Sequence, residues 1–216
     1  MYDPDSILAW LDENVEGMRR SRKKTLSAIV GSAMRMQGTG VLALGRSMTG
    51  TAKAKHRIKR VDRFLGNEQV EIDAVNNTVF QQFSPRDEPV VVLADWTDRY
   101  RFQTLTLALP RDGRAIPFYS ISVEKGDGSG AHKGLMIEAE ADAMDALATM
   151  CGEGIKPIII ADRGFGNTRW LSDIQNKGWY FVQRISREIY LEVEEYTGHG
   201  YELKIPRGRR PRDWGK

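Results

Sequence analysis

The first part of the chain, up to about residue 66, repeats apolar residues at helical spacing. A first helix is predicted from an apolar stripe formed by Leu8, Leu11 and Val15, and Asp5 or Ser6 can cap this helix. A second is predicted from i, i+3, i+4, i+7, i+8 spacing at Leu26, Ile29, Val30, Ala33 and Met34. Gly38 and Gly40 end it, and residues 41–47 and 51–66 are predicted as two further helices. The last of these has an apolar stripe at Ala54, Ile58, Val61 and Leu65.

The pattern changes from residue 85 onward. Two continuous apolar runs, PVVVLAD at 89–95 and PIIIAD at 157–162, are typical of strands buried on both faces. Strands are also predicted at 100–109, 115–123 and 179–184, and helices at 138–151 and about 167–177. The glycine-rich stretch 126–134 is predicted as a loop, in which His132 lies exposed or contacts phosphate. Residues 188–205 are expected to form a β-hairpin that turns at 197–200.

The element order after the helical front is therefore β-β-β-α-β-α-β. A three-strand meander followed by a helix that returns to a strand parallel to the first predicts a mixed α/β sheet with helices on its faces. We expect two parts, an all-α region over residues 1–80 and a domain over 85–216 that holds the sheet.

Charge is strongly segregated along the chain. Residues 18–63 hold thirteen Lys or Arg and one acid, a net charge of +12, whereas the rest of the 216 residues carries a net charge of −9. Such segregation favours binding to a polyanion, most commonly nucleic acid, although a solvated basic surface is the alternative. His56 lies in the same run and is expected to contact phosphate or solvent. The expected DNA-binding residues of the 51–66 helix are Lys53, Lys55, Arg57, Lys59, Arg60 and Arg63.

Composition excludes several other classes of protein. The single cysteine, Cys151, cannot form an intrachain disulfide and fits a reducing cytoplasm. The apolar runs are too short to cross a bilayer, and the first residues are acidic, unlike a secretory signal. We therefore expect a cytoplasmic protein with no membrane partner.

Asp95 and Asp162 each end one of the two apolar runs, 67 residues apart. If these strands pair in parallel, both carboxylates emerge at the same edge of the sheet, where open α/β sheets bind ligands. Two carboxylates about 4 Å apart repel by about 4 kcal/mol at an effective dielectric near 20, so a cation between them is favourable. Oxygen ligands suit Mg²⁺ or Mn²⁺. The alternative is that each Asp caps the turn that follows it.

Three segments resemble insertion-sequence transposases of the DDE type, over about residues 20–205. LADWTD (93–98) and IIIADRGFGN (158–167) are similar to the first and second acidic motifs, and AKHRIKRVDRFLGN (54–67) to the basic helix before the core. The resemblance implies an RNase H-like catalytic core, preceded by a DNA-binding region, that cuts transposon ends and joins them to target DNA. It implies that Asp95 and Asp162 are catalytic metal ligands and that Arg163 lies close to DNA phosphate.

The resemblance also implies Mg²⁺ or Mn²⁺ as cofactor, double-stranded DNA as partner, a homodimer, and association with the bacterial nucleoid. The hairpin at 188–205 would begin the β-rich insertion of such enzymes. The chain departs from the family in one respect, because no Glu has the Tyr-x2-Arg-x3-Glu spacing of the third acid. A truncated, weak or inactive transposase is therefore expected, and a DNA-binding regulator of transposition is the main alternative. A metal-dependent phosphatase is a third interpretation.

Overall fold

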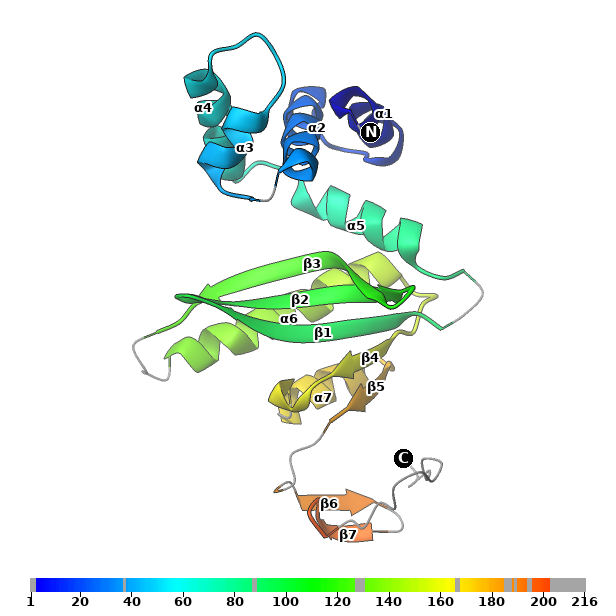
Figure 1. Ribbon diagram of the computed structural model, residues 1–216. Coiled ribbons are helices and arrows are strands. Elements are labelled where there is room, and N and C mark those ends of the chain that lie inside the picture. The colour runs from blue at the N-terminus through cyan, green and yellow to red at the C-terminus, as the bar shows by residue number, and fades with distance from the viewer. Residues whose placement is uncertain are drawn as a thin grey trace. The chain divides into compact units, whose positions relative to one another are not determined.

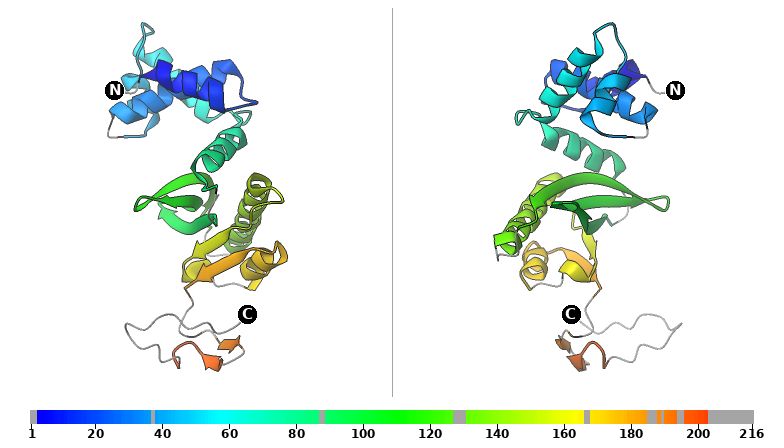
Figure 2. Two further views of the ribbon diagram at one scale, coloured as in Figure 1. Left: turned by 90° about the vertical axis from the view of Figure 1, so that its right-hand side faces the viewer. Right: turned by 60° about the vertical axis from the view of Figure 1, so that its left-hand side comes forward.

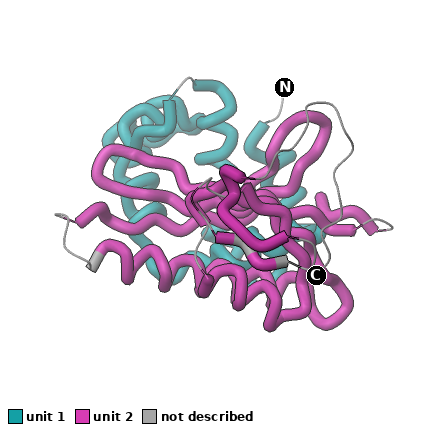
Figure 3. Tube along the Cα trace, turned by 90° about the horizontal axis from the view of Figure 1, so that it is seen from below, with its two compact units in different colours: residues 1–82 teal, residues 83–216 magenta. Residues whose placement is uncertain are grey.

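The structure, a computed structural model, describes residues 3–36, 38–86, 89–126, 131–165, 168–184, 188, 190–193 and 196–202. The chain forms two compact units, residues 1–82 and 83–216, which Figure 3 distinguishes by colour. No helix in these described ranges has both the length and the apolar character needed to cross a membrane.

Unit 1 is built from helices (Figure 1): α1 (Pro4–Asn14), α2 (Arg20–Arg35), α3 (Val41–Ser47), α4 (Ala54–Leu65) and α5 (Ile72–Phe83), of which α5 runs one residue into unit 2. The N-cap of α1 is Asp3, whose Oδ1 accepts hydrogen bonds from the backbone N–H groups of Asp5 and Ser6, both at 2.8 Å. The prediction that Asp5 or Ser6 caps this helix is wrong, because Pro4 already occupies the first helical position.

Two apolar clusters hold unit 1 together. The first joins α2, α3 and α4 and is made by Ile29, Leu44, Met48 and Val61. The second joins α1 to the segment after α4 and is made by Leu11, Val15 and Met18 with Val70, Ala74 and Val75 around them. Leu65 and Met34, both predicted to face inward, are 58% and 56% exposed. Phe64 packs on the first cluster in place of Leu65.

Helix α5 occupies a stretch to which the sequence pattern assigned no element. Its first half packs on α1 through Ala74 and Val75, and the hydroxyl of Thr78 donates to the carbonyl of Asn14 at 3.1 Å. Phe80 on the same helix is fully buried. Tertiary contacts therefore stabilise a helix whose Asn-Asn-Thr centre has low intrinsic helix propensity.

Unit 2 contains a five-stranded sheet in the order β3-β2-β1-β4-β5. Strands β1, β2 and β3 form an antiparallel meander, and β4 and β5 run parallel to β1. This confirms the mixed α/β sheet and the order of elements predicted from the sequence. The elements are β1 (Val91–Arg99), β2 (Phe102–Arg111), β3 (Arg114–Glu124), α6 (Ala131–Cys151), β4 (Ile158–Ala161), the 3-10 helix η1 (Arg163–Phe165), α7 (Thr168–Asn176) and β5 (Tyr180–Gln183).

Helices α6 and α7 cover one face of the sheet, as the views in Figures 1 and 2 show. Helix α6 begins seven residues before its predicted start, so Gly134 and His132 belong to a helix rather than to the expected loop. The buried side chains between sheet and helices include Val92, Leu105, Leu107, Ile159, Ala143, Leu147, Trp170 and Ile174.

On the other face of the sheet, the side chains are polar over the meander and apolar over the parallel strands. Over the meander it carries hydroxyl pairs, with Thr104 Oγ1 2.9 Å from Ser122 Oγ and Thr106 Oγ1 3.3 Å from Ser120 Oγ. Over the parallel strands it carries apolar side chains, including Ile160. The edge strand β3 is interrupted where Leu107 pairs with Tyr119 but Ala108 pairs with Pro117, which leaves Phe118 as an extra residue in a bulge.

A separate hairpin follows, formed by β6 (Tyr190–Val193) and β7 (Tyr196–His199). The hairpin itself is confirmed, but its predicted turn at 197–200 is wrong because Thr197, Gly198 and His199 lie in β7 and pair with β6. The strands are connected at residues 194–195, which lie outside the described residues, as do residues 203–216.

Candidate functional site

Asp95 and Asp162 occupy equivalent positions on neighbouring parallel strands. Strands β1 and β4 pair in register from Val91 with Ile158 to Ala94 with Ala161, and the residue that follows each of these two alanines in the chain is the aspartate. Neighbouring strands lie about 4.8 Å apart. The pairing thus brings two carboxylates that are 67 residues apart in the sequence to one edge of the parallel part of the sheet.

Asp95 lies within its strand rather than at its end, unlike the prediction. Strand β1 continues to Arg99, and Asp95 is paired with Thr106 of β2. Strand β4 stops at Ala161, after which η1 begins. Asp95 therefore marks the point at which β1 leaves β4 while remaining bonded to β2.

The alternation of side chains assigns the two aspartates to the face opposite α6. Trp96, the neighbour of Asp95, points to α6, where its Nε1 donates to Glu140 Oε1 at 3.2 Å. Since successive side chains of a strand point to opposite faces, Asp95 points away from that helix. On β4, Ile159 and Ala161 are buried while Asp162 is exposed.

Each aspartate is held by one local hydrogen bond. Thr97 Oγ1 donates to Asp95 Oδ2 at 3.0 Å, and the backbone N–H of Gly164 donates to Asp162 Oδ1 at 2.7 Å. The second bond is the turn-capping contact that the sequence left open as an alternative. Each bond uses one of two carboxylate oxygens, so capping and ligand binding are compatible.

Gly164 packs closely against the Asp162 carboxylate. A Cβ atom added at Gly164 would lie 2.9 Å from Asp162 Oδ1, which is shorter than real Cβ contacts. The absence of a side chain here therefore allows the carboxylate to take its observed position. The Gly in the Asp-Arg-Gly-Phe motif has a direct geometric role.

The pair offers oxygen donors of the kind that Mg²⁺ and Mn²⁺ prefer, from two exposed carboxylates. Among the described residues, no group of three or more His, Cys, Asp or Glu side chains is arranged to hold a metal ion. The two aspartates therefore supply at most part of a metal coordination sphere from the described residues.

The second acid of the LADWTD motif, Asp98, belongs to a different cluster. Its Oδ1 accepts from Gln103 Nε2 at 2.7 Å and its Oδ2 lies 3.1 Å from Lys125 Nζ. These two contacts hold the pKa of Asp98 below its ordinary value. His132 joins the same cluster, with Nε2 2.6 Å from Gln103 Oε1, and it is half-buried rather than the exposed loop histidine that was predicted.

The six basic residues predicted on α4 have different environments. Arg57 is half-buried and donates to the backbone carbonyls of Gly50 and Arg46, at 3.2 and 3.5 Å. It therefore ties α4 to the end of α3 and the turn that follows it. The remaining five are exposed: Lys53, Lys55, Lys59, Arg60 and Arg63. Arg163, the basic residue next to Asp162, is exposed in η1.

The sequence alone did not identify the partners of these basic residues on α2. Arg19, Ser21 and Thr25 of the α2 region line a cleft together with His56 and Arg60 of the α4 region. Arg19 was visible only as part of a basic run, and Thr25 carried no signal of its own. Their contribution depends on how α2 and α4 pack, which spacing along one helix does not report.

Comparison with protein-family models gives no match to this chain, and no curated protein matches it.

Proposed function

We propose that this chain is a segment of a DDE-type DNA transposase, with Asp95 and Asp162 as two of its catalytic carboxylates. The single observation that carries this proposal is the parallel register of β1 and β4, in which the two aspartates are the next equivalent positions. The antiparallel meander followed by two helix-linked parallel strands supports an RNase H-like fold for the sheet of unit 2. Unit 1, with its basic α4, would bind the DNA.

In this proposal Asp95 and Asp162 hold the cation through their oxygens, while Thr97 and the backbone of Gly164 orient the two carboxylates. A bound Mg²⁺ or Mn²⁺ would activate water or a 3′-hydroxyl and stabilise the leaving oxygen of a phosphodiester. Arg163 follows Asp162 directly and is exposed, so its guanidinium can bind a phosphate of the DNA. A third carboxylate would complete the site.

A test of metal binding need not depend on activity. Fe²⁺ with ascorbate cleaves a polypeptide backbone close to where the iron binds, and it replaces Mg²⁺ at oxygen sites. We expect cuts near residues 95 and 162, suppressed by excess Mg²⁺ and lost in Asp95→Asn and Asp162→Asn. Asp112→Asn is the matched control, because Asp112 is an exposed acid in the turn after β2. Cuts unchanged in Asp162→Asn would contradict the assignment.

Catalysis is tested by Mn²⁺-dependent nicking of DNA that carries the natural ends flanking the coding sequence. We expect any nicking by the full chain to disappear in both aspartate variants and to persist in Asp112→Asn. Nicking that survives Asp162→Asn would overturn the proposed mechanism.

A second candidate function is a DNA-binding regulator that occupies transposon ends without cutting them. The observation in its favour is that, among the described residues, no third acidic side chain joins Asp95 and Asp162 in a group that could hold a metal ion. This function predicts tight binding to the end DNA in EDTA and no nicking with Mn²⁺. The two experiments above, with a binding measurement, distinguish it from the enzyme.

A further inference from the structure

A cleft of about 710 Å³ lies between α4 and the start of α2 within unit 1. One water molecule takes up roughly 30 Å³ in the liquid, so the cleft has room for a stretch of polymer backbone and is not limited to a single ion. Both helices contribute to its basic and polar lining, through Arg19, Thr25, His56, Lys59, Arg60 and Arg63.

The α4 side of the cleft is one stripe of the helix. Positions 56, 59, 60 and 63 follow i, i+3, i+4, i+7 spacing, so their side chains share a face. Val61 is buried in the apolar cluster with α2 and α3. Lys53 and Lys55 are exposed outside the cleft, and Arg57 is bound to backbone carbonyls. The basic residues of α4 and its N-cap therefore form two groups. Lys59, Arg60 and Arg63 line the cleft, and Lys53, Lys55 and Arg57 do not.

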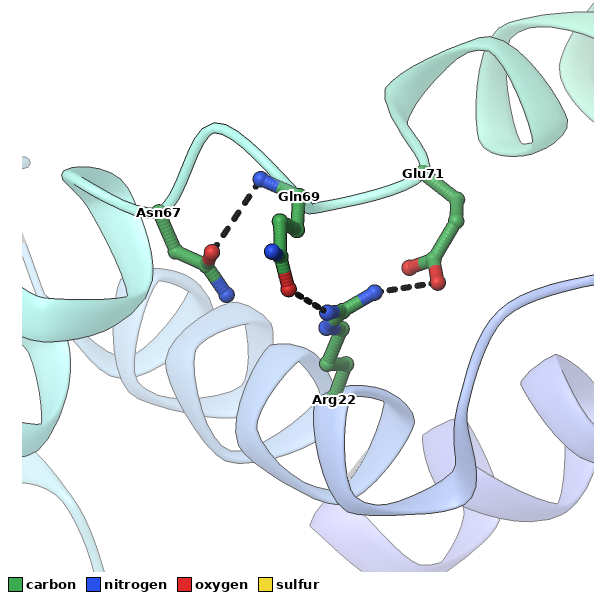
Figure 4. Close-up of polar contacts among 4 residues, drawn as sticks. All are labelled: Arg22, Asn67, Gln69 and Glu71. Atoms are coloured by element: carbon green, nitrogen blue, oxygen red, sulfur yellow. Dashed lines mark hydrogen bonds and ion pairs between the residues drawn. The ribbon is translucent and has the colours of Figure 1, made fainter.

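Carboxylates near α2 neutralise three of its basic residues, Arg20, Arg22 and Lys23. Arg22 pairs with Glu71 and also donates to Gln69 Oε1 at 3.1 Å, as Figure 4 shows. Gln69 is in turn held by Asn67, whose Oδ1 accepts from the Gln69 backbone N–H at 3.1 Å. Arg22 thus fixes the segment after α4 to α2, and its charge is already compensated.

Asp12 of α1 takes up two further charges, because it lies 3.4 Å from Arg20 and 3.8 Å from Lys23. Besides Arg22, the cationic groups that line the cleft are Arg19, Lys59, Arg60 and Arg63, and no carboxylate of the described ranges forms an ion pair with these four. The cleft therefore holds four positive charges that no carboxylate of the described residues compensates.

Arg60 is oriented across the cleft by Thr25. Arg60 Nε and Nη2 donate to Thr25 Oγ1 at 3.2 and 3.1 Å, and the Thr25 hydroxyl donates to the carbonyl of Ser21 at 3.1 Å. A guanidinium has five N–H donors, so these two bonds fix its direction and leave others for a ligand. A preoriented arginine loses less conformational freedom when it binds a phosphate.

The lining favours a phosphate backbone over unpaired bases. Single-stranded nucleic acids are typically bound by aromatic side chains on which bases stack. Phe64 lines this cleft, but its side chain packs on the apolar cluster of α2, α3 and α4 and is only partly exposed. Cationic groups and hydroxyls dominate the remaining surface.

We propose that this cleft binds the phosphodiester backbone of double-stranded DNA, with Arg19, Lys59, Arg60 and Arg63 as the phosphate contacts and Thr25 as a positioning residue. The proposal rests on the DNA-binding part of the proposed function, and it is independent of the metal site in unit 2. Of the DNA contacts expected on α4, the proposal keeps Lys59, Arg60 and Arg63. It adds Arg19, which lies outside that helix.

The test compares two variants of the full chain that each remove two charges from the α4 region. Lys59→Gln/Arg63→Gln alters the cleft, and Lys53→Gln/Lys55→Gln alters the surface outside it. Binding to a duplex of the natural ends is measured in EDTA over a range of salt concentrations. We expect the cleft variant to bind at least tenfold more weakly and to lower the log–log salt slope by about 2, since each phosphate contact contributes about 0.9. The control variant should change affinity less than threefold.

Equal losses in the two variants would overturn the proposal, because they would indicate a diffuse electrostatic attraction. Tighter binding to single-stranded DNA or to RNA than to the duplex would overturn the assigned ligand. Circular dichroism melts of both variants establish that they fold. Because binding is measured in EDTA, which removes divalent metal, a failed metal site and a failed cleft give different results.

Discussion

Gly45 of α3 lies directly against the backbone of Ile58 of α4. A Cβ atom at Gly45 would be 2.5 Å from the Ile58 Cα, closer than two carbon atoms can approach. The two helices therefore pack at a distance that only glycine permits at this position, and this contact supports the helix that carries the cleft.

We predict that Gly45→Ala destabilises unit 1 by about 1–3 kcal/mol, the usual cost of overpacking, or more, because the clash is with backbone. Urea unfolding followed by circular dichroism measures the change. Gly38→Ala is the control, since a Cβ there meets no atom within 4 Å. Equal stability of the two variants would show that α3 and α4 can separate without cost.

Gly164→Ala should displace the Asp162 carboxylate without unfolding unit 2. The new methyl group would lie within 2.9 Å of Asp162 Oδ1, and the side chain is free to rotate away because it is exposed. If Asp162 binds metal, we expect Mn²⁺ affinity to fall about 10-fold or more, as for other changes to groups that orient a ligand. Titration calorimetry measures this, with Gly154→Ala as a control in open space.

Asp98 should make stability depend on pH below its ordinary pKa. Its pKa in the folded chain is lowered from 3.8 by Gln103 and Lys125, so the ionised form is favoured on folding. The stabilisation is present above pH 3.8 and is lost as the pH falls through the lower, folded pKa. Wild type should therefore exceed Asp98→Asn in stability at pH 6, and the two should converge toward pH 2. A constant difference over this range would show that the charge is not responsible.

Cys151 should be unreactive in the folded protein. Burial raises the pKa of its thiol from 9.0 to about 11, which lowers the thiolate fraction about 100-fold near neutral pH. Labelling with a chromogenic disulfide should be slow in buffer and fast in guanidinium. Rapid labelling of the native chain would indicate that the end of α6 opens readily.

Thr25→Val should weaken DNA binding about fivefold, the effect of one hydrogen bond, while leaving the fold intact. The reason is that valine keeps the shape of threonine but cannot accept from Arg60. The decisive measurement is a double-mutant cycle with Arg60→Ala. If Thr25 acts by positioning Arg60, its substitution should have no further effect in the Arg60→Ala background, whereas a purely structural role would give additive losses.

The sheet was predictable because its strands carry the strongest pattern in the sequence. PVVVLAD and PIIIAD are continuous apolar runs, and each is followed by turn or polar residues, so their type and approximate ends could be read directly. The continuation of β1 through Trp96 to Arg99 could not be, because these residues pair only with β2 and are solvated on one face.

The helical unit was less predictable in detail. The residues of α5 include three poor helix formers in a row, Asn76, Asn77 and Thr78, and the helix depends on packing with α1. The inward position of Phe64 instead of Leu65 is a difference of one residue, about 100° around the helix axis. Such rotation is set by neighbouring helices that the local pattern does not specify.

The pairing of Asp95 with Asp162 followed from the sequence once the strands were recognised, because parallel neighbours bring equivalent positions together. The roles of Arg57 and Thr25 could not be inferred from the sequence. Arg57 looks like any other cation in a basic helix until its bonds to the carbonyls of Gly50 and Arg46 are seen. Side-chain roles that depend on a second element are outside the reach of spacing along the first.

The bulge at Phe118 and the proline beside it give the two borders of the sheet different susceptibilities to aggregation. Pro117 has no N–H to donate, and the bulge twists β3, so a foreign strand cannot add along that border without a gap. At the opposite border, β5 presents Tyr-Phe-Val-Gln in regular extended form with Val182 58% exposed. If partly folded copies of this protein associate into β-structured aggregates, they should nucleate at β5.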